Sequence, residues 1–323
     1  MAETVAQQAA QIPTVVSSTA PAGRLKEEAP RASWARARER LAWIMVAPSL
    51  AVVGFIALYP LFQTFRLSFT DARFGSARAV EYVGFQNYDR ILNDSDFLDA
   101  LVRTFQFTIS SVVLETLFGI TVALVINTNF PARGLVRTAM LLPWAIMTVV
   151  SAQLWKYMFD QNAGVINDIL VTRLGILDEK IAWTSRLSTT LWSLVAIDVW
   201  KTTPFMALLL LAGLQVIPGD VYEASFIDGA SKVQQFFQIT LPLLKPALMV
   251  ALVFRTLDAF KVFDLPYVTT GASPSTQTVA VYAQQTLVND LRLGRSSAVS
   301  VIIFLIIGVM VLGYTRFVKI EEN

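Results

Sequence analysis

Charged side chains lie inside long apolar segments of this 323-residue sequence, and they are its clearest candidates for chemistry. One segment carries Asp198 and Lys201, a later one carries Arg255 and Asp258, and an earlier one carries Glu115. A charge at the centre of a membrane helix costs about 2.5–3.5 kcal/mol on insertion scales, so such residues mark a substrate path or a structural ion pair. Charges three residues apart can also neutralise each other within one helix. Pairing between helices or with a partner subunit is a further possibility, and these structural roles stay open for both pairs. Glu115 is expected to face a partner helix.

Polar and aromatic residues beside these charges suit a carbohydrate ligand. Four residues of one segment share the spacing of a single helix face: Asp198, Lys201, Thr202 and Phe205. Trp144 and Thr148, four residues apart, follow Pro143 in an earlier segment. Sugar hydroxyls need polar partners, and the apolar face of a sugar ring can lie against an aromatic ring. Such a surface suits a sugar, although an aromatic residue such as Trp144 is more often a packing or interface residue.

The sequence lacks the usual parts of an enzyme. It contains no His and no Cys, which removes the commonest general base, the commonest metal ligand and all thiolate chemistry. It also has no G-x-x-x-x-G-K-[ST] pattern, so it cannot bind ATP in a P-loop. The net charge of +2 is too small to suggest a nucleic-acid partner. We expect a non-catalytic chain that holds no metal.

Composition and hydropathy indicate a membrane protein. Hydrophobic residues make up 54% of the chain and charged residues 15%, against about 25% charge in soluble domains. Six apolar segments reach the length of roughly 20 residues that spans a bilayer: 41–65, 103–127, 135–159, 188–214, 243–263 and 296–317. Internal Pro and Gly interrupt several of them, which membrane helices tolerate. The prediction is an all-α polytopic membrane protein whose six transmembrane helices form one membrane domain over residues 41–320, surrounded by membrane lipid.

The N-terminal flank sets the expected orientation. The first 30 residues are rich in Ala, Gln, Thr, Ser and Pro without apolar periodicity, and a basic run then reaches Arg40. We expect residues 1–40 to form a disordered basic tail. Because basic flanks stay in the cytoplasm, this tail is expected to be cytoplasmic. Six spans then place both termini on that side.

A polar loop at about 218–242, between the fourth and fifth segments, carries the densest motif of the sequence. Asp220 is expected to cap a short helix, with Glu223 at the spacing of a capping box. Gly229 is expected to end that helix. Pro242 marks the start of the next span. On the predicted topology this loop is cytoplasmic.

The string EAS-x-x-DGA-x5-F-x-x-I-x-LP in this loop resembles the EAA loop of binding-protein-dependent ABC importer permeases. Nine positions match the pattern: Glu223, Ala224, Asp228, Gly229, Ala230, Phe236, Ile239, Leu241 and Pro242. Ser225 replaces the usual second Ala. The resemblance implies a coupling helix that inserts into a cleft of a separate ATPase. The residues implied to couple to that ATPase are Glu223, Ala224, Asp228, Gly229 and Ala230.

The resemblance extends from about residue 40 to the end of the chain and is greatest to sugar permeases of the maltose and trehalose type. It is carried by VGFQNYDRIL, GLVRTAMLLPW, VWKTTPFMALLLLAGLQVIP and FRTLDAFKVFDLPYVTTGASP. The sugar contacts of those permeases carry over onto Trp144, Thr148, Asp198, Val199, Lys201, Thr202, Phe205, Thr256, Asp258 and Ala259. Arg255 joins the substrate-binding candidates through its position in the fifth segment. Charges at several of these positions depart from the maltose permeases and argue against maltose itself.

The resemblance also implies partners. These are a second permease subunit, a pair of ATP-binding subunits that hold ATP and Mg, and an extracytoplasmic sugar-binding protein, all at a bacterial or archaeal inner membrane. The expected cargo is a disaccharide such as trehalose or maltose. The alternative is an ion-coupled secondary transporter or channel that uses Asp198 and Asp258 as proton or cation sites. That alternative predicts inverted repeats and leaves the loop at 218–242 without a role. An intramembrane enzyme would lack any nucleophile constellation.

Overall fold

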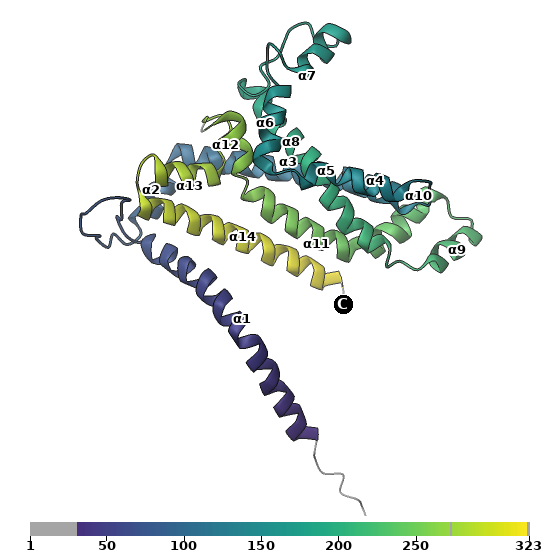
Figure 1. Cartoon of the computed structure of the whole chain (residues 1–323), viewed down its shortest axis with the longest axis horizontal. Helices are drawn as coiled ribbons and strands as arrows, with labels where there is room; N and C mark the ends of the chain where they lie inside the picture. The colour runs from purple at the N-terminus through teal and green to yellow at the C-terminus, as the bar shows by residue number, and fades with distance from the viewer. Residues whose placement is uncertain (1–30, 272, 322–323) are drawn as a thin grey trace, which may run out of the picture. The chain divides into compact units, whose positions relative to one another are not determined.

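The computed structural model describes residues 31–271 and 273–321, and all regular elements among them are helices apart from one isolated β-bridge, Thr70 with Tyr82 (Figure 1). Contacts divide the chain into a part that ends at Tyr59 and a part that begins at Pro60. Five of the described helices are long and apolar enough to span a membrane, and a bent pair makes a sixth span. The all-α prediction with six spans is confirmed in this form.

Helix α1 (Arg31–Leu67) carries the first candidate span, Arg38–Leu67. It begins within the segment predicted to be a disordered tail, so residues 31–40 are helical. The sequence RASWARARER is rich in Ala, Arg and Glu, which are strong helix formers, and this propensity explains the earlier start. The disorder predicted for residues 1–30 lies outside the described residues.

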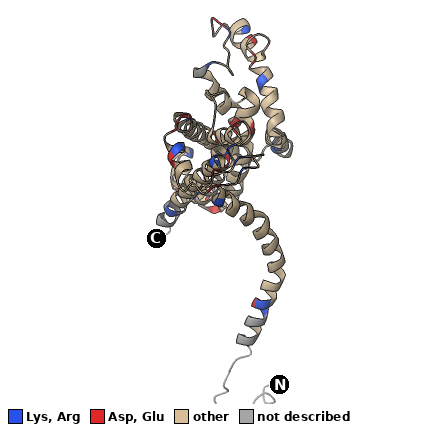
Figure 2. Ribbon diagram, turned by 90° about the vertical axis from the view of Figure 1, so that its left-hand side faces the viewer, with Lys and Arg blue, Asp and Glu red and all other residues tan. Residues whose placement is uncertain are grey.

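The second part of the chain is a bundle built on α3 (Ser95–Asn127), α8 (Leu187–Leu214), α11 (Leu241–Phe260) and α14 (Leu293–Glu321). Helix α3 packs against α8 and α11, and α11 packs against α14. Small residues allow the close approach, as is usual between membrane helices. A Cβ added at Gly119 of α3 would lie 2.5 Å from Cγ of Met206 on α8, and one at Gly213 would lie 2.4 Å from Cβ of Ala247 on α11. Lys, Arg, Asp and Glu are sparse along these helices (Figure 2).

The third predicted span is bent. Helices α4 (Arg133–Met140) and α5 (Leu142–Ala145) precede α6 (Thr148–Met158), and the chain turns by 89° at the break between α5 and α6. The two residues at the break, Ile146 and Met147, have extended backbone with ψ of 136° and 139°. The predicted span at 135–159 is therefore divided among three helices, and the bend places Trp144 and Thr148 on either side of a corner.

The fifth span starts earlier than predicted. Helix α10 (Lys232–Gln235) and the π-helical turn η2 (Phe236–Thr240) lead into α11, and together they form the candidate span Lys232–Phe260. The π-helical turn ends two residues before Pro242, whose missing N–H interrupts the ladder of a regular α-helix.

Short helices lie at the ends of this bundle. Helix α9 (Gly219–Ile227) lies at one end, and α2 (Gln86–Leu92) lies at the opposite end beside α13 (Val279–Val288) (Figure 1). Helix α12 (Asp264–Thr270) follows α11 and packs against α6. The segment between α6 and α8 contains α7 (Val165–Asn167) and the π-helical turn η1 (Asp168–Arg173).

Candidate functional site

One buried arginine gathers the intramembrane charges. Arg255 of α11 is 2% exposed, and it forms ion pairs with Glu115 of α3, with Asp198 of α8 at 2.9 Å and with Asp258 of its own helix at 2.7 Å. The hydroxyl of Thr202 donates to Glu115 Oε1 at 2.5 Å. The five N–H donors of a guanidinium allow one side chain to serve three carboxylates. We call these five residues the Arg255 cluster.

The Arg255 cluster settles which of the predicted pairs form. The pair within α11, Arg255 with Asp258, is present, whereas Asp198 pairs with Arg255 and forms no ion pair with Lys201. Glu115 faces α8 and α11, as expected for a carboxylate that meets a neighbouring helix. Removing one partner of a buried ion pair costs about 3–5 kcal/mol, because it leaves an uncompensated charge. The cluster therefore ties three membrane helices together.

A cavity of about 340 Å³ opens beside the Arg255 cluster. Seven of the predicted sugar contacts line it: the polar or aromatic residues Trp144, Thr148, Asp198, Lys201, Thr202 and Asp258, together with Ala259. They come from α5, α6, α8 and α11, so the bend between α5 and α6 is what brings Trp144 and Thr148 to the same wall. We call this space the charged cavity. Its rim also includes Lys261 and Asp264, which the site prediction omitted.

Aromatic rings support one wall of the charged cavity. The rings of Trp144 and Phe205 stack with centroids 5.7 Å apart and planes at 11°. Phe205 was predicted to share the polar face of α8, but it does not line the cavity. Its ring instead supports Trp144 from behind. The ammonium of Lys201 lies 3.5 Å from the backbone oxygen of Trp144. The backbone of Trp144 thus lies next to a cation.

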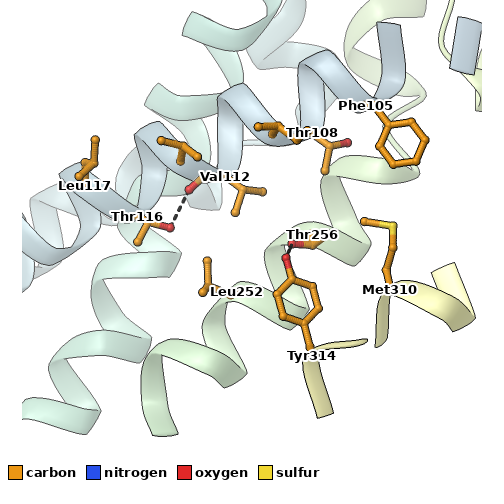
Figure 3. Close-up of a pocket in the computed structure, with 11 residues that line it drawn as sticks. Phe105, Thr108, Val112, Thr116, Leu117, Leu252, Thr256, Met310 and Tyr314 are labelled. Atoms are coloured by element: carbon orange, nitrogen blue, oxygen red, sulfur yellow. Dashed lines mark hydrogen bonds between the residues drawn. The ribbon is translucent and has the colours of Figure 1, made fainter. Parts of the chain in front are cut away.

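Thr256 is not brought to the charged cavity. Its hydroxyl shares a hydrogen bond of 3.0 Å with that of Tyr314, and both residues line a second cavity of about 340 Å³ between α3, α11 and α14 (Figure 3). That cavity is mostly apolar, with Val112, Leu252 and Met310 among its lining residues. Thr256 faces another side of α11 from Asp258, because adjacent residues of a helix point about 100° apart.

The charged cavity offers hydrogen-bonding groups rather than a reactive centre. It combines carboxylate, ammonium and hydroxyl groups with an indole ring. The three carboxylates of the Arg255 cluster converge on a guanidinium. Among residues 31–271 and 273–321, no group of three or more acidic side chains is arranged to hold a metal ion. Hydroxyl-bearing ligands need hydrogen-bond donors and acceptors of this kind.

The loop with the EAS–DGA motif forms the helix α9 that was predicted, with one correction. Gly229 ends the helix with φ of +81°, as expected. Asp220, however, does not cap the helix and forms no capping box with Glu223. The cap lies two residues earlier, at Pro218 in an extended conformation, and Asp220 lies in the first turn. An acidic residue there still favours the helix dipole.

Two side-chain hydrogen bonds hold α9 against the segment that follows it. The amide of Gln235 donates to the hydroxyl of Ser225 at 3.0 Å, and the hydroxyls of Tyr222 and Thr240 lie 3.0 Å apart. Ser225 was noted only as a departure from the usual Ala, and the structure gives it a role that Ala could not fill. The motif residues Glu223, Ala224, Asp228 and Gly229 remain exposed, and Ala230 is half-buried.

The sequence is similar to a family of known proteins and to several of its members. Residues 115–320 match the family described as "Binding-protein-dependent transport system inner membrane component". The chain is 41% identical over 278 residues to the trehalose/maltose transport system permease protein of Thermococcus litoralis, which covers 85% of this chain and 91% of the relative. It is 37% identical to the sulfoquinovosyl glycerol transport system permease protein of Agrobacterium fabrum, over 87% of this chain and 91% of the relative. It is 38% identical to the trehalose transport system permease protein of Mycobacterium tuberculosis, over 83% of this chain and 85% of the relative.

A solved structure shares the fold. A chain of a bacterial ABC transporter involved in the import of the acidic polysaccharide alginate matches with a TM-score of 0.73 and 21% identity. The match covers 90% of this chain and 98% of that chain. At this identity the likeness shows the fold alone.

Proposed function

The chain belongs to the family of binding-protein-dependent transport system inner membrane components, and on that premise we propose that it carries a disaccharide such as trehalose or maltose. Membership makes the chain a multi-pass, non-catalytic permease subunit of an ABC importer, and ATP hydrolysis belongs to a separate subunit. Three relatives support a carbohydrate cargo, because two are trehalose or trehalose/maltose permeases and one is a sulfoquinovosyl glycerol permease.

The charged cavity is the observation that carries this proposal. Its volume of about 340 Å³ falls within the range of about 300–1,000 Å³ that is typical of ligand pockets. Trp144 supplies a ring face for a sugar ring, and Lys201 and Asp258 supply a donor and an acceptor for hydroxyls. Asp258 keeps its side chain 73% exposed although it pairs with Arg255, so it can accept from a ligand as well.

Within this site we assign two kinds of role. The residues proposed to touch the sugar are those that line the cavity: Trp144, Thr148, Asp198, Lys201, Thr202 and Asp258. Phe205 and Arg255 act indirectly, because Phe205 supports Trp144 and Arg255 orients Asp198 and Asp258. Thr256 lies outside the proposed sugar site because it faces the apolar cavity.

We also propose that α9 is the coupling helix of an EAA-type loop. Glu223, Ala224, Asp228, Gly229 and Ala230 would contact the ATP-binding subunit. Support comes from the apolar side chains that α9 exposes, since Phe226 is 76% exposed and Ile227 is 83% exposed. Exposed large apolar residues beside polar ones are typical of a surface that another protein covers.

The assembly that follows has both termini of this chain in the cytoplasm, on the same side as α9. A second permease subunit would complete the pathway, and a pair of ATP-binding subunits would hold ATP and Mg. A binding protein on the far side would deliver the sugar, which agrees with the binding-protein dependence of the family. The ion-coupled alternative is disfavoured, because Asp198 and Asp258 are already paired with Arg255.

The test is sugar uptake by the complete importer in proteoliposomes. We expect uptake of labelled trehalose to require ATP on the side of the ATP-binding subunits and to stop in Trp144→Ala. The matched control is Trp192→Ala, which removes a tryptophan of α8 that is 58% exposed and outside the cavity. Uptake driven by an ion gradient without ATP would contradict the proposal, as would normal uptake by Trp144→Ala.

A further inference from the structure

Four arginines surround a pocket at the end of the bundle that carries α2. The pocket has a volume of about 290 Å³, and its charged lining comprises Arg73, Arg90, Arg292, Arg295 and Asp71. These residues come from three separate stretches of chain: the segment after α1, helix α2 and the start of α14. We call this space the arginine pocket. It shares no lining residue with the charged cavity.

Most of the positive charge in the arginine pocket is uncompensated within the described part of the chain. Arg295 pairs with Asp94, whereas Arg73 and Arg292 are exposed and form no ion pair with any described residue. Asp71 already accepts a hydrogen bond of 2.8 Å from the backbone of Glu81. The Nε of Arg295 is buried, and no described atom accepts its hydrogen bond. The pocket therefore presents N–H donors that lack acceptors.

Hydrogen bonds to the backbone shape the arginine pocket before any ligand binds. The N–H of Gly294 donates to the oxygen of Ala72 at 2.9 Å, and a Cβ on Gly294 would lie 2.0 Å from the oxygen of Thr70. The side-chain amide of Asn87 donates to the oxygens of Ser68 and Thr70 at 2.9 and 2.8 Å. These contacts fix the segment after α1 against α2 and α14, so the arginines converge without rearrangement.

The position of the pocket along the membrane normal points to its ligand. Candidate spans end at Leu67 and begin at Ser95 and Leu293, and the pocket lies among these three ends. This is the depth of the headgroup layer, which adds about 10–15 Å to the hydrocarbon core of a bilayer. An aromatic cluster adjoins it, in which the ring of Phe69 lies 5.3 Å from that of Phe85 and 5.5 Å from that of Tyr88. Tyr and Trp are enriched at the membrane–water interface, and Tyr82, whose ring lies 6.3 Å from that of Phe69, is 76% exposed.

We propose that the arginine pocket binds the phosphate group of a membrane phospholipid. Guanidinium groups bind phosphate oxygens through paired N–H donors, which a single ammonium cannot do. Arg73 contacts the phosphate from the segment after α1, and Arg292 contacts it from the residue before α14. The lipid tails lie along the apolar helices. The bound lipid links the segment after α1 to α14. This inference is independent of the sugar that the importer carries.

The experiment uses the assembled importer in nanodiscs of phosphatidylcholine and phosphatidylglycerol. Native mass spectrometry then counts the phosphatidylglycerol retained after release into detergent. The double variant Arg73→Gln/Arg292→Gln should weaken retention of one lipid about 30-fold, the combined effect of two arginines at a membrane surface. Arg186→Gln is the matched control, because Arg186 precedes α8 as Arg292 precedes α14 but lies outside the pocket. Arg73→Lys/Arg292→Lys keeps the charge and should weaken retention less.

Three results would overturn the assignment. One is unchanged lipid retention by the double glutamine variant. Another is binding of inorganic phosphate by the wild-type complex without retention of phosphatidylglycerol. The third is a double glutamine variant that retains lipid as the wild type does but binds the sugar-binding protein more weakly, which would make the pocket a protein-docking surface. If the glutamine variant does not assemble, the lysine variant decides the matter by the same count.

Discussion

Arg255 of α11 donates hydrogen bonds to both carboxylate oxygens of Glu115 of α3, although the two residues are 140 positions apart in the sequence. Both side chains are buried. The same guanidinium also reaches Asp198 of α8, so one side chain connects three helices of the bundle. Because Asp198 also lines the charged cavity, the ion pairs that hold the helices together also fix the geometry of the proposed sugar site.

The first prediction concerns stability. Arg255→Met should destabilise the protein by about 3–5 kcal/mol, because it leaves buried carboxylates without a cation. The measurement is unfolding of the purified complex in mixed micelles with increasing SDS. Arg103→Met is the control, since Arg103 pairs with the exposed Asp99, and exposed pairs contribute about 0–1 kcal/mol. Equal losses in the two variants would show that the Arg255 cluster has no special structural role.

A second variant sharpens this prediction. If the loss in Arg255→Met comes from uncompensated charge, then Arg255→Met/Glu115→Gln should recover part of it. No recovery would indicate that the lost packing of the long arginine side chain, rather than charge, is responsible.

Hydropathy predicted the spans better than their shapes. The apolar stretches at 103–127 and 188–214 correspond closely to α3 and α8. The bend at Ile146 and Met147 was missed, because neither residue is a helix breaker and Pro143 lies within the short helix α5. The corner depends on packing of α6 against α12 and α8, which a local pattern does not contain.

Helical spacing identified residues that share one face of a helix. The spacing of Asp198, Lys201 and Thr202 placed all three on the face of α8 that lines the charged cavity. Spacing alone could not choose between pairs within one helix and pairs between helices, because the pairing of Asp198 with Arg255 depends on how α8 meets α11. Lys261 continues the three-residue spacing of Arg255 and Asp258, and that spacing was the signal that could have added it to the site.

The second prediction tests the substrate path at Thr202. Thr202→Trp should abolish sugar uptake, because the ring would fill the charged cavity. Thr202→Val is the control: it removes the hydrogen bond to Glu115, a loss of about 1 kcal/mol, but leaves the cavity open. Uptake into proteoliposomes should persist in the valine variant. Normal uptake by the tryptophan variant, in a fully assembled complex, would place the sugar path elsewhere.

The third prediction concerns pH at the end of the bundle that carries α2. Burial raises the pKa of Asp94, but hydrogen bonds from the Tyr282 hydroxyl and the Asp96 N–H, together with the Arg295 charge, outweigh it and lower the pKa. A lowered native pKa stabilises the fold above the unfolded pKa of about 3.9. That contribution to stability is lost as the pH falls through the lowered pKa of Asp94 in the folded protein.

Thermal unfolding of the detergent-solubilised complex should reveal this contribution. The wild-type Tm should fall more steeply than that of Asp94→Asn as the pH decreases below about 4. Asp99→Asn is the control, because Asp99 is an exposed carboxylate of the same helix. Identical pH profiles for wild type and Asp94→Asn would show that Asp94 does not contribute to acid sensitivity.

The fourth prediction concerns coupling at Gly229. Its φ of +81° is a left-handed conformation, and a Cβ there would meet no atom within 4 Å. The cost of a substitution therefore comes from the backbone, at about 1–2 kcal/mol for most residues. Gly229→Val should keep the protein in the membrane, loosen the ATP-binding subunit and stop transport, while Glu223→Ala should give a milder defect. The measurement is the amount of ATP-binding subunit that co-purifies with tagged permease, alongside sugar uptake.

Two substitutions separate backbone strain at Gly229 from a general effect on the loop. Gly229→Asn should retain more ATP-binding subunit than Gly229→Val, because Asn tolerates the left-handed region. Gly219→Val should retain the wild-type amount, because Gly219 lies in the same loop, has no positive φ and has open space around it. A Gly229→Val permease that retains its ATP-binding subunit and transports at the wild-type rate would show that α9 is not the coupling element. If Gly219→Val and Gly229→Val were equally defective, bulk rather than backbone conformation would limit docking.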